Sequence, residues 1–373
     1  MARLDAHVLV VNAGSSSLKL RVLSPDDVVT ACADLPAPRG TADSGKIQQA
    51  IESFGRVDAV GHRVVHGGTL YAAPVLVDAE VRRRLESLTD LAPLHQPKSL
   101  AALDAVSAVL PDASAVACFD TAFHATIDDA AATYALPAEW RARWTLRRYG
   151  FHGLSHAYAS RRVAELLGMP PDAPDGLRIV TCHLGAGASL AAVRSGRSVD
   201  TTMGFTPQEG LVMATRSGSV DPGLVLWLEE HAHTPPAELA ATLEYRSGLT
   251  GLAGTSDMRE VLSRAVTGDP RAVLGRDVYL HRLRALVASM AAAMDGLDAI
   301  VFTGGVGENS AEIRSRAAAG LGFLGVRVDE SRNAGNRADD YEIGAAGAPV
   351  RAFVIAARED KQIAGEVRSV LAR

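Results

Sequence analysis

The stretch Val8-Leu-Val-Val-Asn-Ala-Gly-Ser-Ser-Ser-Leu-Lys-Leu-Arg-Val-Leu23 decides the fold. Its apolar residues 8–11 predict a buried strand, and Leu18, Leu20 and Val22 alternate with charged residues as in a half-buried return strand. The small residues of the turn let the backbone approach a ligand, and their amides and hydroxyls can surround a phosphate. An ordinary hairpin turn has the same local pattern, so this stretch alone leaves both interpretations open.

Two later stretches favour the phosphate interpretation. Residues 178–194 repeat the pattern of a strand, a Gly/Ser-rich turn and a second strand, which indicates a duplicated domain. Residues 297–302 predict a further strand that runs into the glycine-rich turn 303–310. Ser310 is a suitable N-cap for a following helix, and such a turn directs backbone amides at an anionic or polar ligand.

Bulk composition limits the function classes. A chain of 373 residues favours two domains, and its contents of 47% hydrophobic and 22% charged residues are those of an ordinary globular protein. With a net charge of −5, the chain has no overall positive electrostatic potential that would attract nucleic acid or an acidic membrane surface. Three widely spaced cysteines make a disulfide framework unexpected, and no apolar window is long enough to span a bilayer. We expect a cytoplasmic enzyme or binding protein.

Isolated charged residues in strand ends and polar loops indicate phosphoryl transfer. Residues 113–119 predict a buried strand that delivers Asp120 to the edge where open α/β sheets bind ligands. Arg63 and Arg216 lie in glycine-rich segments, and phosphoryl transfer needs positioned phosphates, Mg²⁺ and cations more than covalent help. The absence of a Gly-x-Ser-x-Gly motif weakens a serine-hydrolase interpretation.

Three other motifs are weaker. The segment 40–47 is nearly a P-loop, but Ile47 replaces the hydroxyl residue that should hold Mg²⁺ and no strand is expected before it. The segment 320–325 matches a dinucleotide motif but follows a helix and opens a strand, the reverse of the required order. The histidine pairs at 62/66 and 152/156 have zinc-like spacing without an evident third ligand.

Taken together, the long motifs resemble those of acetate kinases. They are Asn12–Lys19, Gly61–Gly68, Phe119–His124, Arg148–Gly153, Asp200–Gly210, Thr215–Gly218 and Phe302–Ser310, in the family's order and over nearly the whole chain. The resemblance implies an α/β fold of the actin-like ATPase superfamily, with two ribonuclease-H-like domains and ATP in the interdomain cleft. Residues 1–125, completed by a C-terminal helix 361–373, would form the first domain, and residues 126–360 the second.

The resemblance also implies an acceptor site. Arg63 would bind the acetate carboxylate, Asp120 would orient and polarise it, and His152 and Arg216 would stabilise the transferring phosphoryl group. The acetate methyl would occupy a small apolar pocket lined by Val65, Leu94, Phe151 and Pro207. No strong general base is needed, because a carboxylate is already ionised at pH 7.

The nucleotide and metal residues follow from the same resemblance. Lys19 would lie near the ATP phosphates, and Asn12 and Glu359 would belong to a Mg²⁺ site, with Mn²⁺ as an alternative metal. The loop over the β- and γ-phosphates would be His183, Leu184, Gly185, Ala186 and Gly187. The adenosine-binding residues would be Asp257, Met258, Arg259, Gly305, Val306, Gly307, Glu308 and Asn309.

The chain departs from the family pattern in places. Ala186 stands where the second phosphate loop usually carries Asn, and Leu154 where Thr is often found. The usual Thr-Asn-Glu-Glu near the C-terminus is replaced by residues 357–360, Ala-Arg-Glu-Asp, and the excursion 24–57 is short. None of these removes a residue that is central to the chemistry.

The implied activity is reversible, Mg²⁺-dependent, in-line transfer of the ATP γ-phosphoryl group to acetate, giving acetyl phosphate and ADP. A propionate or butyrate kinase is the nearest alternative, since one or two methylenes separate these substrates by only ~1–3 kcal/mol. A non-catalytic actin-like ATP-binding protein would not need Arg63, Asp120, His152 and Arg216 together. The family usually forms homodimers, which we expect here, with no nucleic-acid or membrane partner.

Purely structural roles remain open for some of these residues. Arg63, Asp120 and Arg216 could form one interdomain set of salt bridges. Four other histidines are expected to support the site by hydrogen bonding rather than by catalysis, namely His66, His95, His124 and His156.

Overall fold

The computed structural model describes residues 5–14, 17–37, 43–170, 172–173, 176–335 and 339–373. Its internal contacts divide the chain into two units. The first unit comprises Met1–Ala125, Phe151–Tyr158 and Arg358–Arg373, and the second comprises Thr126–Gly150 and Ala159–Ala357.

A six-stranded sheet in the order β3-β2-β1-β4-β6-β5 forms the centre of the first unit. Its strands are β1 (Val8–Ala13), β2 (Ser17–Leu23), β3 (Val29–Pro36), β4 (Ala59–Val64), β5 (Val75–Leu76) and β6 (Ser114–Phe119). β1, β2 and β3 are antiparallel neighbours, β4 and β6 run parallel to β1, and β5 is antiparallel to β6. The predicted hairpin is confirmed as β1–β2, with the amide of Gly14 donating to the carbonyl of Ser17 at 2.8 Å. The turn residues Ser15 and Ser16 lie outside the described residues.

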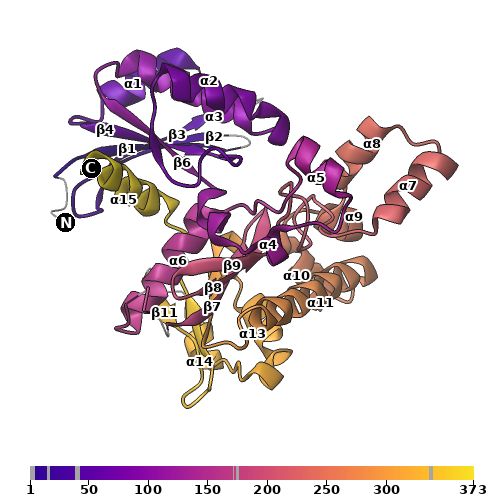
Figure 1. Cartoon of the computed structure of the whole chain (residues 1–373). Coiled ribbons are helices and arrows are strands. Elements are labelled where there is room, and N and C mark those ends of the chain that lie inside the picture. The colour runs from indigo at the N-terminus through magenta and orange to yellow at the C-terminus, as the bar shows by residue number, and fades with distance from the viewer. Residues whose placement is uncertain (1–4, 15–16, 38–42, 171, 174–175, 336–338) are drawn as a thin grey trace. The chain divides into compact units, whose positions relative to one another are not determined.

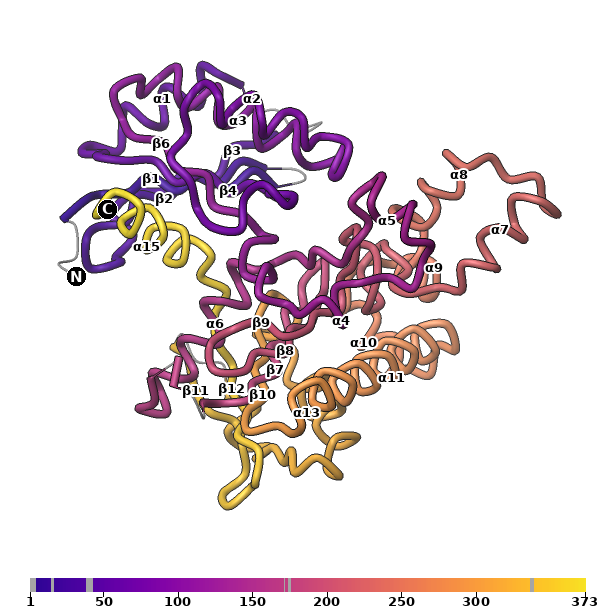
Figure 2. Tube along the Cα trace, viewed as in Figure 1, coloured from indigo at the N-terminus to yellow at the C-terminus, as the bar shows by residue number. Residues whose placement is uncertain are grey.

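Helices cover both faces of this sheet (Figure 1). They are α1 (Ser44–Glu52), α2 (Ala79–Ser87) and α3 (Gln96–Val109) on one face and α15 (Glu359–Leu371) on the other. Alternate residues of β1 face opposite sides, so Leu9 and Val11 pack with Ile47 of α1, while Val8 and Val10 pack with Ile363 of α15. The C-terminal helix therefore lies beside the first strand, as the trace in Figure 2 shows.

The second unit repeats this topology. Its sheet has the order β11-β12-β10-β7-β8-β9. The strands are β7 (Arg178–Leu184), β8 (Ala188–Arg194), β9 (Arg197–Thr201), β10 (Ala299–Thr303), β11 (Tyr341–Glu342) and β12 (Arg351–Val354). β7, β8 and β9 are antiparallel neighbours, β10 and β12 run parallel to β7, and β11 is antiparallel to β12. The internal duplication predicted from the two hairpins is thus a duplication of the whole sheet order.

In the part of the chain that the structure describes, the helices of the second unit are more numerous than those of the first and include the longest one, α11. Among the described residues they are α4 (Asp129–Ala132), α5 (Ala138–Trp144), α7 (Pro222–His231), α8 (Pro236–Ala241), a π-helical turn (Thr242–Arg246), α9 (Gly248–Ala253), α10 (Met258–Val266), α11 (Pro270–Ala292), α12 (Gly304–Asn309), α13 (Ala311–Ala319) and α14 (Glu330–Asn333). Helix α6 (Gly153–Leu166) contributes its first residues to the first unit and the remainder to the second. No helix among the described residues is both long and apolar enough to cross a membrane.

Two expectations from the sequence are wrong, one for the glycine-rich segment after β10 and one for the segment 24–57. The glycine-rich segment after β10 is not an open turn but the helix α12, and only the following helix α13 uses Ser310 as its N-cap, at 3.3 Å from the amide of Ile313. The excursion 24–57 contains β3, which precedes the near-P-loop, so the expectation that no strand stands before that loop fails. The P-loop interpretation still fails at Ile47, whose side chain is buried in the core. Residues 40–42 of that loop lie outside the described residues.

Candidate active site

The carboxyl ends of β4 and β6 bring together a buried ion pair in the first unit. Arg63 lies near the end of β4, and Asp120 directly follows β6, which runs parallel to β4. The guanidinium donates from Nε to Oδ1 of Asp120 at 3.0 Å and from Nη2 to Oδ2 at 2.6 Å. This bidentate fork fixes the orientation of both side chains.

Asn12 and Glu359 complete the cluster. Nη1 of Arg63 donates to Oδ1 of Asn12 at 3.1 Å, and Nδ2 of Asn12 donates to Oε2 of Glu359 at 3.1 Å. Glu359 also lies 3.6 Å from Nε of Arg63. Four residues from β1, β4, β6 and α15 thus meet at one edge of the sheet, although 347 positions separate Asn12 from Glu359 in the sequence.

The electrostatics of this cluster follow from its burial. Burial raises the pKa of Asp120 to about 6, with Arg63 acting in the opposite direction and Glu359 adding to the rise. Burial disfavours the charged form of Arg63, but Asp120 and Glu359 outweigh it and raise the pKa of Arg63. Five N–H groups belong to a guanidinium, and three are used in these bonds, so Nη1 and Nη2 each keep one N–H for another anion.

Glycines allow the close approach that this edge needs. The amide of Gly153, at the start of α6, donates to the carbonyl of Asp120 at 2.8 Å, and a Cβ at Gly153 would lie 2.2 Å from that carbonyl oxygen. A Cβ at Gly61 would lie 2.4 Å from Ile363 of α15. These two positions keep α6 and α15 close to the strand ends that carry Arg63 and Asp120.

The remaining predicted residues of the first unit have different environments. His152 has a left-handed backbone with φ of 56°, directly before α6. Phe151 is buried and packs edge-on against the ring of His66, with ring centroids 5.5 Å apart. Val65 is half-buried, Leu94 is 45% exposed, and Lys19 is exposed and paired with Asn12 in the β1–β2 register.

Arg216, in the second unit, is paired with a residue that the sequence did not single out. Its Nε donates to Oε1 of Glu244 at 2.8 Å, and its Nη1 donates to the carbonyl of Pro207 at 3.0 Å. Glu244 lies in the π-helical turn, a geometry that often occurs at functional sites. Within the first unit Arg63 pairs with Asp120, and within the second unit Arg216 pairs with Glu244.

A polar network supports the loop that carries Pro207. The hydroxyl of Tyr134 donates to Oε2 of Glu209 at 2.7 Å, and Arg148 donates to Oε1 at 2.9 Å. Burial raises the pKa of Tyr134 to about 12, and the hydrogen bond to Glu209 adds to the rise. A Cβ at Gly204 would collide with the side-chain ends of Glu209 and Tyr134, so a larger residue there would displace their hydrogen bond.

A cavity of about 630 Å³ lies entirely within the second unit. Its lining combines the β7–β8 turn, the starts of α10 and α12, and apolar side chains. The lining residues are Gly185, Ala186, Ala214, Leu249, Ser256, Asp257, Met258, Arg259, Leu262, Tyr279, Gly305, Val306, Asn309 and Ser310. Of the predicted nucleotide residues, the structure brings Gly185, Ala186, residues 257–259, Gly305, Val306 and Asn309 to one cavity.

Other predicted nucleotide residues do not line it. His183 and Leu184 end β7, with Leu184 buried, and Gly187 accepts from the amide of Gly185 at 2.9 Å to close the turn. Gly307 is buried. The carboxylate of Glu308 instead accepts from the backbone amides of Gly304 at 2.9 Å and Ala357 at 3.0 Å.

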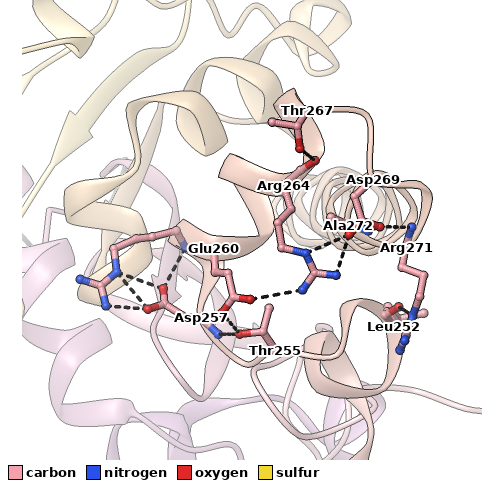
Figure 3. A network of polar contacts seen from close by, with 10 residues as sticks. Leu252, Thr255, Asp257, Glu260, Arg264, Thr267, Asp269, Arg271 and Ala272 are labelled. Atoms are coloured by element: carbon pink, nitrogen blue, oxygen red, sulfur yellow. Dashed lines mark hydrogen bonds and ion pairs between the residues drawn. The ribbon is translucent and has the colours of Figure 1, made fainter.

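A network of ion pairs and hydrogen bonds includes two cavity-lining residues, Asp257 and Arg259 (Figure 3). Asp257 caps α10 by accepting from the amide of Arg259 at 2.9 Å, and the Arg259 side chain lowers the pKa of Asp257 to about 2. Glu260 accepts from Thr255 at 2.7 Å and from Arg264 at 3.2 Å. Arg264, in the last turn of α10, also pairs with the N-cap of α11, Asp269, at 2.7 Å, so the end of α10 is tied to the start of α11.

Sequence reasoning missed several residues. Glu244 and Tyr134 gave no motif, since each is a single polar residue that becomes informative only through its partner, and Glu209 was quoted only as part of the motif Asp200–Gly210 without a role of its own. Leu249, Leu262 and Tyr279 lie at ordinary apolar positions of helices or near them. Of the residues that depart from the family pattern, Ala186 is exposed at the cavity, and Leu154 packs in the core with α15.

No group of three or more His, Cys, Asp or Glu side chains suited to a metal occurs within the described part of the chain. The zinc interpretation of the histidine pairs therefore has no support there. The oxygen atoms of Asn12 and Glu359 fit Mg²⁺ better, because Mg²⁺ is usually held by one or two carboxylates together with substrate phosphates.

Comparison with known proteins decides the family. The model of the acetokinase family matches residues 40–365. The chain belongs to the acetokinase family. The acetate kinase of Nostoc punctiforme is 46% identical, over 87% of this chain and 79% of that protein. The acetate kinase of Shouchella clausii is 42% identical, over 96% of this chain and 98% of that protein.

Solved structures of the acetokinase family have the same fold. The acetate kinase of Porphyromonas gingivalis is 35% identical with a TM-score of 0.89, over 98% of this chain and 100% of that one. A propionate kinase from Francisella tularensis is 33% identical with a TM-score of 0.87, over 97% of this chain and 98% of that one. The prediction of two ribonuclease-H-like α/β domains is confirmed.

Proposed function

We propose that this member of the acetokinase family transfers the γ-phosphoryl group of ATP reversibly to acetate, giving acetyl phosphate and ADP. The observation that carries the proposal is the strand-end cluster of Arg63, Asp120, Asn12 and Glu359 in a chain whose relatives are acetate kinases. A non-catalytic ATP-binding protein would gain nothing from this cluster, because burying charged groups is costly unless they serve a purpose.

The acceptor is proposed to bind at Arg63. The guanidinium is held on one edge by Asp120 and on another by Asn12, so its orientation is set before a ligand arrives. The free N–H groups of Nη1 and Nη2 suit a carboxylate, which accepts two parallel hydrogen bonds. We propose that Asp120 acts by orienting this guanidinium and the acceptor. Val65, Leu94, Phe151 and Pro207 are proposed to contact the acetate methyl.

The nucleotide is proposed to bind in the cavity of the second unit. Leu249, Met258 and Leu262 offer an apolar surface for a base, and a cavity of about 630 Å³ is of the size that binds small molecules. The β7–β8 turn, residues 185–187, presents backbone amides suited to phosphates. Lys19 and His183 are proposed to contact phosphates as well, and Arg259 to contact the adenosine.

Asn12 and Glu359 are proposed to hold Mg²⁺, and Mn²⁺ prefers the same oxygen ligands. The ion would neutralise charge on the phosphate oxygens during transfer. The chain's own residues do the positioning. Asn12 is fixed between Arg63 and Glu359, and Arg216 is held by Glu244 through Nε and by Pro207 through Nη1.

The proposed reaction is a direct in-line displacement. A carboxylate oxygen of acetate attacks the γ-phosphorus, the bond to the β–γ bridging oxygen breaks, and that oxygen leaves with ADP. His152 and Arg216 are proposed to stabilise the charge on the transferring phosphoryl group, as positioned cations do in other phosphoryl transfers.

The test is a hydroxylamine-trapping assay with ATP and Mg²⁺ and with acetate, propionate or butyrate in parallel. We expect acyl hydroxamate to form fastest from acetate. Faster formation from propionate would assign the longer acceptor instead, an alternative raised by the similarity to the Francisella tularensis propionate kinase structure. No acyl phosphate from any of the three acids would overturn the proposed activity.

We also propose a homodimer. Helix α7 has no buried residue, and Leu224, Leu226 and Trp227 are 48%, 58% and 52% exposed. Figures 1 and 2 show α7 and α8 extending away from the sheet of the second unit. Light scattering should give twice the mass of one chain, and Trp227→Glu should give a monomer; a wild-type monomer at micromolar concentration would refute the proposal.

The cytoplasm is the proposed location. Cys32, Cys118 and Cys182 are all free thiols, as is usual in a reducing compartment.

A further inference from the structure

Some residues of helix α12 line the cavity of the second unit, and others do not. Gly305, Val306, Asn309 and Ser310, at its exposed side and end, line the cavity of the second unit. Gly307 and Glu308 do not line the cavity. A helix of six residues makes few internal hydrogen bonds, so its position depends on what holds the side away from the cavity.

The guanidinium of Arg314, on α13, binds this far side. Arg314 is 2% exposed, and its Nη1 donates to the carbonyls of Gly307 at 2.9 Å and Glu308 at 2.7 Å. These carbonyls belong to the last turn of α12, where helical acceptors lack partners of their own. Arg314 therefore satisfies two carbonyl groups that the short helix leaves open.

The other nitrogens of Arg314 bind one residue of α14. Nε donates to the side-chain oxygen of Asn333 at 2.7 Å, and Nη2 donates to its backbone carbonyl at 2.7 Å. Asn333 is 1% exposed and donates in turn to the carbonyl of Ala311 at 2.9 Å. All four bonds of this buried cation thus go to uncharged oxygens, an arrangement that is costly unless the geometry it enforces is useful.

Glu308 holds the other end of the same helix. One of its carboxylate oxygens accepts from the amide of Gly304, at the first residue of α12, and from the amide of Ala357, after β12. We call Arg314, Asn333 and Glu308 the α12 clamp. The clamp ties both ends of α12 to α14 and to the segment that follows β12.

We propose that the α12 clamp positions the nucleotide-binding face of α12, and that Arg314 is its central positioning residue. The inference rests on the proposed binding of nucleotide in this cavity. Among the described residues, the side-chain hydrogen bonds of Arg314 go to Gly307, Glu308 and Asn333, none of which lines the cavity. Arg314 acts by fixing the backbone of Gly307 and Glu308, and thereby the neighbouring Gly305, Val306 and Asn309. Replacement by lysine keeps the charge but loses the planar fork that reaches four acceptors.

The test compares Arg314→Lys and Asn333→Ala with a control, Arg316→Lys. Arg316 lies on the same helix but is exposed, and it pairs with Glu312 at 2.8 Å. Titration calorimetry would measure the Kd for ADP, and the hydroxylamine-trapping assay would measure the KM values for ATP and acetate and the kcat. Thermal unfolding would report the stability of each variant.

We expect Arg314→Lys and Asn333→Ala to raise the Kd for ADP and the KM for ATP by about tenfold, the size of effect that a small misplacement of a binding element produces. The KM for acetate should stay within about twofold of wild type, as should every constant of Arg316→Lys. A role in folding alone would lower the Tm and the active fraction without this split between the two KM values.

Folded variants with wild-type ADP affinity would overturn the inference and leave the proposed function intact. If Arg314→Lys fails to fold, Asn333→Ala decides, because it removes one acceptor and keeps the guanidinium. A wild-type chain that binds no ADP would instead overturn the proposed nucleotide site, and this inference with it.

Discussion

The two sheets have the same strand order but different side chains at matching positions. Aligning the ends of the two hairpins places Asn12 with His183, and the strand registers then place Arg63 with Thr303 and Asp120 with Ala357. The first sheet therefore carries an ion pair and an amide where the second carries a histidine, a hydroxyl and a methyl group.

This difference shows that two sheets with the same strand order carry different kinds of side chain at their strand ends. At the first sheet, a charged side chain that is removed from water needs a counter-ion, and Arg63 and Asp120 are hydrogen-bonded counter-ions of each other. At the second sheet, the strand end of β10 is followed directly by the short helix α12, part of which lines the cavity. The second unit has a half-buried ion pair elsewhere, between the loop residue Arg216 and Glu244.

The largest effect is expected when the loop cation of the second unit is removed. Arg216→Ala should lower kcat by about 10³-fold, because a positioned cation at the transferring phosphoryl group stabilises developing charge. Steady-state kinetics by the hydroxylamine-trapping assay would measure it. Arg246→Ala is the control, since Arg246 is an exposed residue of the neighbouring π-helical turn that pairs with Glu238. Turnover within tenfold of wild type would show that the second unit supplies no such cation.

The buried ion pair of the first unit is tested by Asp120→Asn. This change keeps the shape but leaves the Arg63 guanidinium without its direct counter-ion. That loss outweighs the relief of the desolvation that raises the pKa of Asp120, so we expect a loss of about 3 kcal/mol in the free energy of unfolding. The kcat should fall by about 10²-fold, since the guanidinium loses its fixed orientation. Urea denaturation and kinetics would measure the two effects.

Asp104→Asn is the matched control for stability, because Asp104 pairs with Arg82 at the surface. An exposed pair of this kind is worth about 1 kcal/mol or less. Equal losses in the two variants would mean that burial adds nothing to the Arg63–Asp120 pair.

A smaller effect is expected at Glu244, which supports Arg216. Glu244→Gln keeps an acceptor for Nε of Arg216 but removes the charge, so kcat should fall by about tenfold with the KM for acetate unchanged. Glu238→Gln, which alters the exposed pair with Arg246, should leave both constants unchanged. Wild-type kcat in Glu244→Gln would restrict Glu244 to a structural role.

The smallest expected effect is on the pH dependence of the unfolding free energy. It distinguishes buried histidines of the first unit from an exposed histidine of the second. His62 and His124 are buried in the first unit, and burial lowers the pKa of each imidazole to about 4. The unfolded chain takes up these protons near pH 6.5, before the folded chain does, so the stability from each histidine is present above pH 6.5 and is lost as the pH falls toward 4.

His62→Leu should therefore remove about 1 kcal/mol of the change in unfolding free energy between pH 7 and pH 5.5. Urea denaturation at both pH values measures this difference. His281→Leu, at an exposed position of α11 in the second unit, should leave the pH dependence unchanged. An identical pH dependence in wild type and His62→Leu would contradict the assignment of a buried, neutral imidazole.

Much of the scaffold was predictable because local patterns carry it. The alternation around residues 8–23 and 178–194 predicts both hairpins, and the buried run before Asp120 predicts β6. Strand β3 was not predictable from its hydrophobic pattern, because at the sheet edge none of its residues is fully buried and two of its half-buried residues are alanine. The glycines of α12 concealed a helix, since glycine disfavours helices unless neighbouring structure holds them.

The sequence by itself determined which residue types stand at the strand ends and in the polar loops, because strand period and turn chemistry are local properties. Only the tertiary structure decided their partners. It paired Arg63 with Asp120 and Arg216 with Glu244, turned Glu308 toward backbone amides, and brought Asn12 to Glu359 across 347 positions. The physical reason is that a hydrogen bond or ion pair depends on distance in space, which parallel strand pairing and the return of α15 to the first sheet establish.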